Sequence, residues 1–243
     1  MSHLDYKPIT RRRRPHIHPL DATLFLTFRL AGSIPQAIVR NYKEKRKHLT
    51  EQLRRARSAR AQDPDSSELQ LLAERIETHQ REWFLKSEEI LHRATHGPTW
   101  LKDESVARKV VENLHRLDGE AFRLDAFSVM SNHVHTVFKP LLSTQELEEM
   151  FDEDLGFFFV TKHPGLAKIM QLLKGRTSRE CNLILGRSGS FWEHESFDHV
   201  IRSGKFDKTI RYVLNNPVKI HLVDNWQDWP WNYCRKELVE RFT

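Results

Sequence analysis

Two histidines two residues apart, His133 and His135, stand in a stretch whose β-branched and aromatic residues indicate a strand. Side chains two apart on a strand point to the same face, so the imidazoles would lie near enough to bind one divalent ion. An isolated pair with this spacing is more often two ordinary half-buried strand residues. The pair is favoured as a site by its place on a predicted central strand and by the residues that follow it.

A second pair, His16 and His18, has the same spacing but stands between Pro15 and Pro19. Proline cannot donate a hydrogen bond to a neighbouring strand, which makes a central strand improbable there. We therefore interpret this pair as unrelated to a metal site.

Tyr212 and Asn216 are four residues apart in a predicted helix and so would share one face. A phenol hydroxyl and an amide oxygen could then meet the histidine pair together. The alternative is that Tyr212 packs in the core and that Asn215, Asn216 and Pro217 only end the helix. The combination with the histidines favours the site.

The elements that would position these residues follow the order β-α-β-β-α-β-α. This order predicts an α+β fold with a ferredoxin-like, split βαβ antiparallel sheet and a C-terminal helix that carries the tyrosine. The predicted strands are 22–30, 121–130, 133–138 and 191–202; the predicted helices are 103–117, 166–185 and one from Lys205 to Pro217.

An inserted helical hairpin, at about 36–96, is predicted after the first strand, with a turn at 63–67. It has three possible roles: it closes on itself, its basic face extends a DNA footprint, or its apolar seam recruits a second copy of the chain. We read residues 1–20 as a basic arm and 21–243 as one domain that carries the insertion.

The composition allows a folded, basic protein: of 243 residues 39% are hydrophobic, and the net charge is +6 with a pI near 9.4. A basic balance favours polyanionic partners. Cys181 and Cys234 are the only cysteines, far apart, so neither a disulfide framework nor a thiolate zinc site is indicated. No apolar run approaches the roughly 20 residues that a bilayer needs, so we expect a cytoplasmic protein without a membrane partner.

Four segments, in this order, resemble the REP-associated tyrosine transposases, which are relatives of the single-tyrosine HUH transposases. They are Asn132–His135, Phe191–Trp192 with Phe197–Arg202, Tyr212 with Asn215–Lys219, and Trp229–Trp231. The resemblance covers Glu120 to Tyr233 well and Pro15 to Arg29 loosely, and the hairpin is not part of it. The family has Gln where Glu193 stands here, which puts the local role of Glu193 in doubt.

The resemblance implies an HUH nuclease fold, Mg²⁺ or Mn²⁺, and cleavage of single-stranded DNA without ATP. Carried over by motif, His133 and His135 match the metal-binding pair, Tyr212 the nucleophile and Asn216 the third ligand. The expected partner is single-stranded DNA with hairpin or repeat elements. His199, Glu193 and Asn215 are possible site-lining residues, and a cluster of Glu193, His194, Glu195, Asp198 and His199 ranks below the histidine pair as a metal site.

Basic and aromatic residues supply candidates for contact with DNA phosphates and bases. The alternative is that the charges are solvated and that each aromatic belongs to the core. The predicted contacts are Arg11, Arg12, Arg13, Arg14, Arg176, Arg179, Arg187, Arg202, Lys219 and Trp192, with Phe197 and Trp231 as further stacking candidates.

The expected function is therefore endonuclease and strand transferase activity through a 5′-phosphotyrosine. Two rivals remain open. One is a non-catalytic DNA-binding protein derived from such a transposase. The other is a metal hydrolase unrelated to DNA, which the positive charge and the lack of a carboxylate beside the histidines disfavour.

Overall fold

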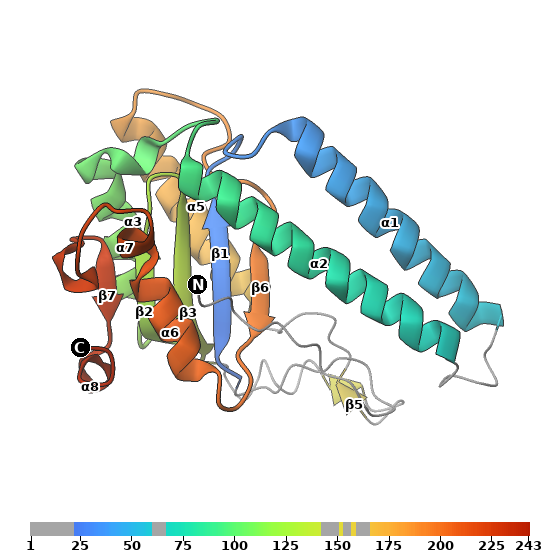
Figure 1. Ribbon diagram of the computed structural model, residues 1–243. Coiled ribbons are helices and arrows are strands. Elements are labelled where there is room, and N and C mark those ends of the chain that lie inside the picture. The colour runs from blue at the N-terminus through green and yellow to red at the C-terminus, as the bar shows by residue number, and fades with distance from the viewer. Residues whose placement is uncertain (1–21, 60–66, 142–150, 153–156, 159–165) are drawn as a thin grey trace. The chain divides into compact units, whose positions relative to one another are not determined.

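The computed structural model describes residues 22–59, 67–141, 151–152, 157–158 and 166–243 (Figure 1). The chain forms two compact units, and the described residues of the first run from 32 to 98. The second comprises residues 22–31 and the described residues from 99 to 243. We call them the hairpin unit and the sheet unit. The predicted basic arm, with Arg11 to Arg14, and the pair His16 and His18 lie outside the described residues.

The sheet unit has a five-stranded antiparallel sheet in the order β6-β1-β3-β2-β7. β3 lies between β1 and β2, which splits the first β-α-β unit as the element order predicts. The strands are β1 (Leu24–Arg29), β2 (Phe122–Val129), β3 (His133–Pro140), β6 (Phe197–Val200) and β7 (Asn232–Cys234).

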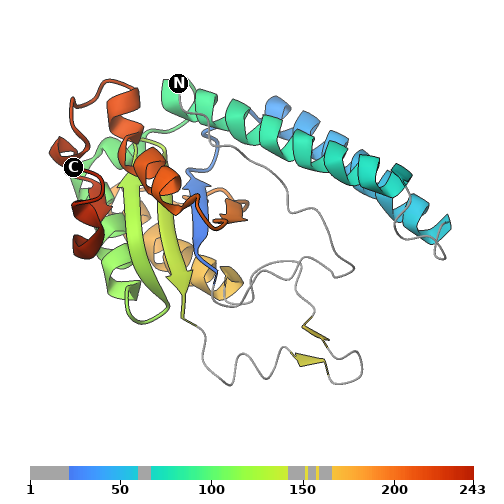
Figure 2. The ribbon, with the colours of Figure 1, turned by 60° about the horizontal axis from the view of Figure 1, so that its bottom comes forward.

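One face of this sheet is covered by α3 (Glu104–Leu117) and α5 (Leu166–Ile184) (Figure 2). Leu24, Leu26 and Phe28 of β1 belong to the same apolar cluster as residues of both helices. Because strand side chains alternate, the odd-numbered residues of β1 point to the opposite face. Val134 and Phe138 of β3 also join the cluster. His133 and His135 therefore share the face opposite to α3 and α5.

Local sequence signals account for the position of α3. Asp103 caps the helix, because its carboxylate accepts a hydrogen bond of 2.8 Å from the amide of Ser105. Val106, Val110 and Leu114 recur at helical spacing and are buried. The predicted helix 103–117 is confirmed.

A bulge in β2 changes which side chains face the helices. The pairing with β3 shifts register between Leu124 and Ala126. Leu124 precedes the shift and Phe127 follows it, yet both belong to the apolar cluster. Because of the extra residue, the β2 side chains that face the helices are at even positions before the bulge and at odd positions after it. Ser128 is thereby placed opposite His135 in the ladder.

Two predicted elements of the C-terminal third need correction. The predicted strand 191–202 is shorter, since only Phe197–Val200 pairs as β6, while Trp192 makes an isolated bridge to Leu30. The predicted helix from Lys205 to Pro217 is two helices, α6 (Phe206–Leu214) and α7 (Asn216–Lys219). Proline restricts the residue before it and fits the first turn of a helix, so Pro217 favours a new start.

Several short elements were not predicted from sequence. β7 pairs with β2, and its three residues are too few to show a periodicity. The others are η1 (Trp100–Lys102), β4 (Phe151–Asp152), β5 (Phe157–Phe158), η2 (Trp226–Asp228) and α8 (Lys236–Val239).

The hairpin unit contains two long helices, α1 (Gln36–Ala59) and α2 (Ser67–Arg93), as the sequence predicts. Their seam is aromatic: the ring of Tyr42 stacks on Trp83 with centroids 4.3 Å apart and on His79 at 4.7 Å. The chain enters and leaves the unit at Gly32 and Gly97. A Cβ on Gly97 would lie 2.2 Å from the Gly32 carbonyl oxygen, and its φ is +73°, so only glycine fits.

Among the described residues, no helix is long and apolar enough to cross a membrane. Cys181 and Cys234 are both buried free thiols, as their sequence separation predicts.

Candidate active site

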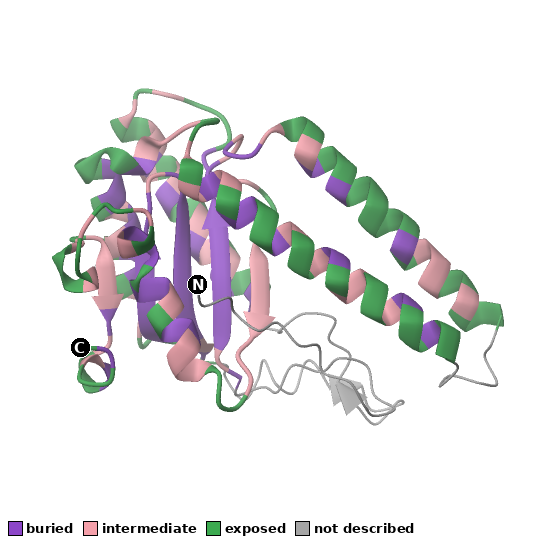
Figure 3. Cartoon of the chain, in the orientation of Figure 1, coloured by how far each residue is buried: buried purple, intermediate pink, exposed green. Residues whose placement is uncertain are grey.

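The histidine pair lies at the centre of the sheet and is buried. His133 and His135 expose 1% and 0% of their surface, and β1 and β3 are buried along nearly their whole length (Figure 3). Their Nε2 atoms are 3.0 Å apart. Octahedral ions with ligand bonds of about 2.1 Å hold adjacent ligands at about this separation.

The Nδ1 atom of each imidazole contacts a different neighbouring side chain. Nδ1 of His133 lies 2.7 Å from Oδ1 of Asn132, an oxygen that can only accept, so this nitrogen carries the proton. Nδ1 of His135 lies 2.8 Å from the hydroxyl of Thr27. The Thr27 hydroxyl can accept from Nδ1–H or donate to Nδ1. In the tautomer in which it accepts, both Nε2 lone pairs converge on one point, and this donor set fits a divalent ion. In the other tautomer, Nε2–H of His135 donates a hydrogen bond to Nε2 of His133.

Tyr212 of α6 packs against the same face of the sheet. Its ring centroid is 5.7 Å from that of His135 and 6.0 Å from that of Phe25. Buried Ile210, Val213 and Leu214 anchor α6, which contacts β2 and β3. Tyr212 itself is half-buried, and the ammonium of Lys219 lies 5.8 Å from its ring centroid.

Asn216 is 1% exposed and follows directly after the break in the helix. Its amide nitrogen donates to the Tyr212 carbonyl at 2.8 Å and reaches the Val213 carbonyl at 3.5 Å. The amide nitrogen therefore caps α6, and the oxygen is the atom suited to a metal. The neighbouring Asn215 is exposed and donates its amide to the Arg211 carbonyl at 2.9 Å. Asn215 is the C-terminal cap of α6.

His199 of β6 joins the site face through the register of the sheet. It pairs with Phe25, and their ring centroids are 5.1 Å apart. Phe25 also stacks on His135 at 5.6 Å, so one ring connects the two histidines. Burial, and then the charge of Arg202, lowers the pKa of His199 to about 4. His199 is therefore neutral at neutral pH.

Glu193 faces Arg29, the cross-strand neighbour of His133. The carboxylate lies 3.3 Å from the guanidinium, and these side chains are 19% and 10% exposed respectively. Burial lowers the pKa of Arg29, and the charges of Glu193 and Glu195 oppose that shift. The residue at which the sequence departs from the family pattern thus balances a buried cation beside the histidines. The position of Arg29 beside His133 could not be predicted from sequence periodicity, because the two residues are on strands far apart in the sequence.

Several predicted DNA contacts lie away from the histidine pair. Trp192 is 5% exposed, packs edge-on against Phe28 with centroids 4.8 Å apart and donates to the Thr177 hydroxyl at 2.8 Å. It is a core residue, so a base cannot stack on it as predicted. Arg187 covers the ring of Trp100 at 3.9 Å. Trp231 is partly buried against the core. Phe197, by contrast, lies on the same face as the histidine pair, half-buried against Phe25.

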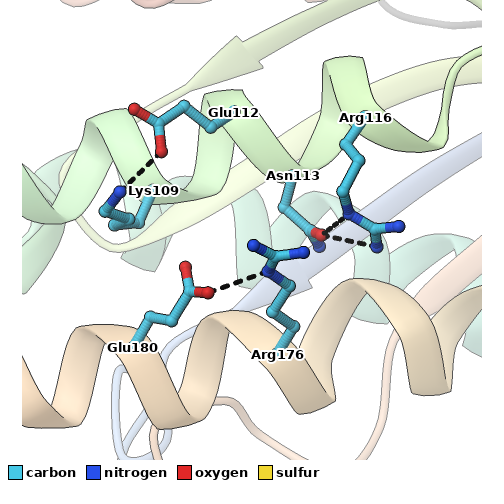
Figure 4. Close-up of a pocket in the computed structure, with 6 residues that line it drawn as sticks. All are labelled: Lys109, Glu112, Asn113, Arg116, Arg176 and Glu180. Atoms are coloured by element: carbon cyan, nitrogen blue, oxygen red, sulfur yellow. Dashed lines mark hydrogen bonds and ion pairs between the residues drawn. The ribbon is translucent and has the colours of Figure 1, made fainter.

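Arg176 lines a small polar pocket between α3 and α5, the helices on the other face of the sheet (Figure 4). It pairs with Glu180 at 2.8 Å, which already offsets its charge. Arg179 is an exposed residue of the same helix. The remaining lining residues of the pocket are Lys109, Glu112, Asn113 and Arg116.

A second pair of metal-binding residue types occurs in the hairpin unit and was missed in the sequence. Glu88 and His92 of α2 are four residues apart, with Oε2 and Nε2 separated by 3.7 Å. The pair could have been identified from the sequence, because Glu and His four residues apart on a predicted helix lie on the same face. The contact is an ion pair when His92 is protonated.

Comparisons with known proteins are sparse. No family model matches the sequence, and no curated protein matches it. A solved structure of a REP-associated tyrosine transposase bound to a REP hairpin is similar to this chain, with a TM-score of 0.43 and 13% identity. The match covers 97% of this chain and 88% of that chain.

Proposed function

We propose that this chain is a metal-dependent single-strand DNA endonuclease and strand transferase of the HUH type, with Tyr212 as the nucleophile. The observation that carries the proposal is the convergence of the His133 and His135 Nε2 atoms, 3.0 Å apart, beside the Tyr212 ring. The resemblance of the motifs in sequence supports the same assignment. Arg202 and Lys219 are the proposed phosphate contacts nearest to this face.

His133, His135 and the Asn216 oxygen would hold Mn²⁺ or Mg²⁺. When bound, the ion neutralises charge on a non-bridging phosphate oxygen and fixes its orientation. Imidazole donors suit transition ions better than Mg²⁺, which prefers oxygen, so Mn²⁺ is the better fit.

The chain's own residues supply the nucleophile and its activation. Tyrosine has an ordinary pKa of about 10, so the hydroxyl needs help to ionise at neutral pH. The Lys219 ammonium, 5.8 Å from the ring, stabilises the phenolate. The phenolate oxygen bonds to phosphorus, the bond from phosphorus to the 3′ oxygen breaks, and that oxygen takes up a proton. The phosphotyrosine keeps the energy of the ester, so a free 3′-hydroxyl can reverse the step.

The direct test is a search for a covalent adduct on a denaturing gel. The full chain is incubated with labelled single-stranded oligonucleotides that carry hairpins, a REP hairpin first, with Mn²⁺ or with EDTA. We expect a Mn²⁺-dependent adduct that is lost in Tyr212→Phe while binding persists. Tyr233→Phe is a matched control, because Tyr233 packs on Phe127 at the far edge of the sheet. An adduct in Tyr212→Phe would overturn the nucleophile assignment, and binding without any adduct would favour the non-catalytic alternative.

A further inference from the structure

The exposed face of α1 concentrates positive charge. Its sequence has eight Lys and Arg residues against two Glu, whereas α2 has four against six. The excess on α1 alone equals the net charge of +6 of the whole chain. All eight cations of α1 are exposed: Arg40, Lys43, Lys45, Arg46, Lys47, Arg54, Arg55 and Arg57.

Four of these cations form one stripe. Arg40, Lys43, Lys47 and Arg54 are spaced by three, four and seven residues, which places them on one side of a helix with 3.6 residues per turn. The buried residues Tyr42 and Leu49 lie on the other side, toward α2. We call this row the α1 stripe. In Figure 3 most of the α1 ribbon is coloured as exposed.

Glu51, one of the two acidic residues of α1, lies on the same side as the α1 stripe and is neutralised locally. It pairs with both Arg54 and Arg55, each at 2.8 Å. Hydrogen bonds from the two guanidinium groups lower the pKa of Glu51 to about 2. The trio keeps one net positive charge, so Glu51 does not interrupt the positive potential along the stripe.

We infer that the α1 stripe binds the phosphate backbone of a nucleic-acid duplex. This goes beyond the proposed cleavage site, and only the choice of DNA as the duplex rests on the proposed function. Arg40 to Arg54 spans about 21 Å at about 1.5 Å per residue. That is about six base pairs at about 3.4 Å each, enough for several phosphates of one groove edge.

Two other polyanions fit the stripe less well. Single strands are bound through stacking on aromatic side chains, and the one aromatic residue in the sequence of α1, Tyr42, is held in the seam by Trp83. A membrane-surface helix must present its apolar face to lipid. The apolar face of α1 packs on α2, with Val39 and Leu91 in one buried cluster. The seam is also closed within the chain, which leaves less apolar surface there to recruit a second copy.

The test measures binding of the full chain, carrying Tyr212→Phe to prevent cleavage, to a labelled 12-base-pair duplex over a range of salt concentrations. We expect the variant Arg40→Gln, Lys43→Gln, Lys47→Gln, Arg54→Gln to bind at least tenfold more weakly. Each lost phosphate contact lowers the salt slope by about 0.9, so the slope should fall by about two to four. The double variant Arg40→Lys, Arg54→Lys should keep the affinity, since it keeps the charge.

The matched control removes four cations from α2: Arg75→Gln, Arg81→Gln, Lys86→Gln, Arg93→Gln. These are exposed in the same unit but stand among carboxylates, so duplex affinity should change little. Equal losses in both variants would mean a net-charge effect and would overturn the inference. Unchanged duplex affinity in the α1 variant would also overturn it. The same follows if the α1 variant loses affinity only for single strands or only for anionic phospholipid vesicles.

Cleavage separates this inference from the proposed function. With an otherwise unmutated chain, the α1 variant should still cleave a short single strand that has no stem. If no adduct ever forms but the α1 variant loses duplex binding, the proposed function fails and the inference stands.

Discussion

The hydroxyl of Thr27 on β1 lies 2.8 Å from Nδ1 of His135 on β3. The two residues are directly opposite in the antiparallel ladder. The contact fixes the ring orientation, and when the hydroxyl oxygen accepts a hydrogen bond from Nδ1–H, the Nε2 lone pair is available to a metal. A residue more than a hundred positions earlier in the sequence thus decides which atom of His135 can bind a metal.

Thr27→Val should weaken Mn²⁺ binding by about 10- to 100-fold, the usual cost of losing a partner of a histidine ligand. Thr27→Ser keeps the hydroxyl and should stay close to the unmutated affinity. Isothermal titration with Mn²⁺ measures both. Thr136→Val is the control, because Thr136 is also buried, on β3, but donates its hydroxyl to the Ala126 carbonyl at 3.3 Å. Normal Mn²⁺ binding by the Thr27→Val variant would remove Thr27 from the site.

Asn216 combines two proposed roles, which substitutions can separate. Asn216→Ala should lose both the oxygen ligand and the cap, and so lower Mn²⁺ affinity at least tenfold and destabilise the fold. Asn216→Asp keeps an oxygen ligand but cannot donate to the Tyr212 carbonyl, so it should bind Mn²⁺ yet lose about 1–3 kcal/mol of unfolding free energy. Titration and urea unfolding measure the two effects. Unchanged Mn²⁺ affinity in Asn216→Ala would leave Asn216 as a helix cap alone.

Glu193→Gln removes the charge of the carboxylate that faces Arg29 and keeps the size of the side chain. Because the substitution removes the charge that balances Arg29, we expect the unfolding free energy to fall by about 1–3 kcal/mol. This is less than the cost of breaking a fully buried ion pair, because the Glu193 side chain is 19% exposed. The uncompensated cation beside His133 should also weaken Mn²⁺ binding. Exposed Glu195→Gln is the control and should have the smaller effect on both. Equal stability and Mn²⁺ affinity in Glu193→Gln would show that the ion pair has no influence on the site.

His199 should make stability depend on pH. Its pKa is about 4 in the folded protein, against an ordinary value of 6.5. Between pH 6.5 and 4, His199 is protonated in the unfolded chain but not in the folded chain. The free energy of unfolding is therefore highest above pH 6.5 and falls as the pH drops toward 4. At about 1.4 kcal/mol per pKa unit the loss reaches about 3 kcal/mol.

His199→Phe keeps a ring against Phe25 and should abolish this part of the pH dependence. Urea unfolding of the variant and of the unmutated chain between pH 4 and 7 gives the difference, which should grow as the pH falls. His194→Phe, at an exposed position, should leave the curve unchanged. Parallel curves for His199→Phe and the unmutated chain would contradict a neutral His199.

The sequence alone determined the elements that depend on local periodicity. The alternation of β3 placed His133 and His135 on one face, and helical spacing predicted α1, α2, α3 and α5. Such features follow from residues within one or two turns of each other, so a single stretch of chain specifies them. The order of the elements also predicted the split sheet, because few topologies satisfy that order.

Only the tertiary structure decided what each histidine touches. Thr27, Arg29 and Phe25 reach the site through the register between β1 and β3, and His199 through the register between β1 and β6. Register is set by packing between distant segments, and local sequence does not encode it. The same holds for Trp192, for which the sequence left open a stacking platform or a core residue, and whose exposure is only 5%. The sequence predicted that His133 and His135 share one face of a strand, whereas the partners that orient their rings come from other segments of the chain.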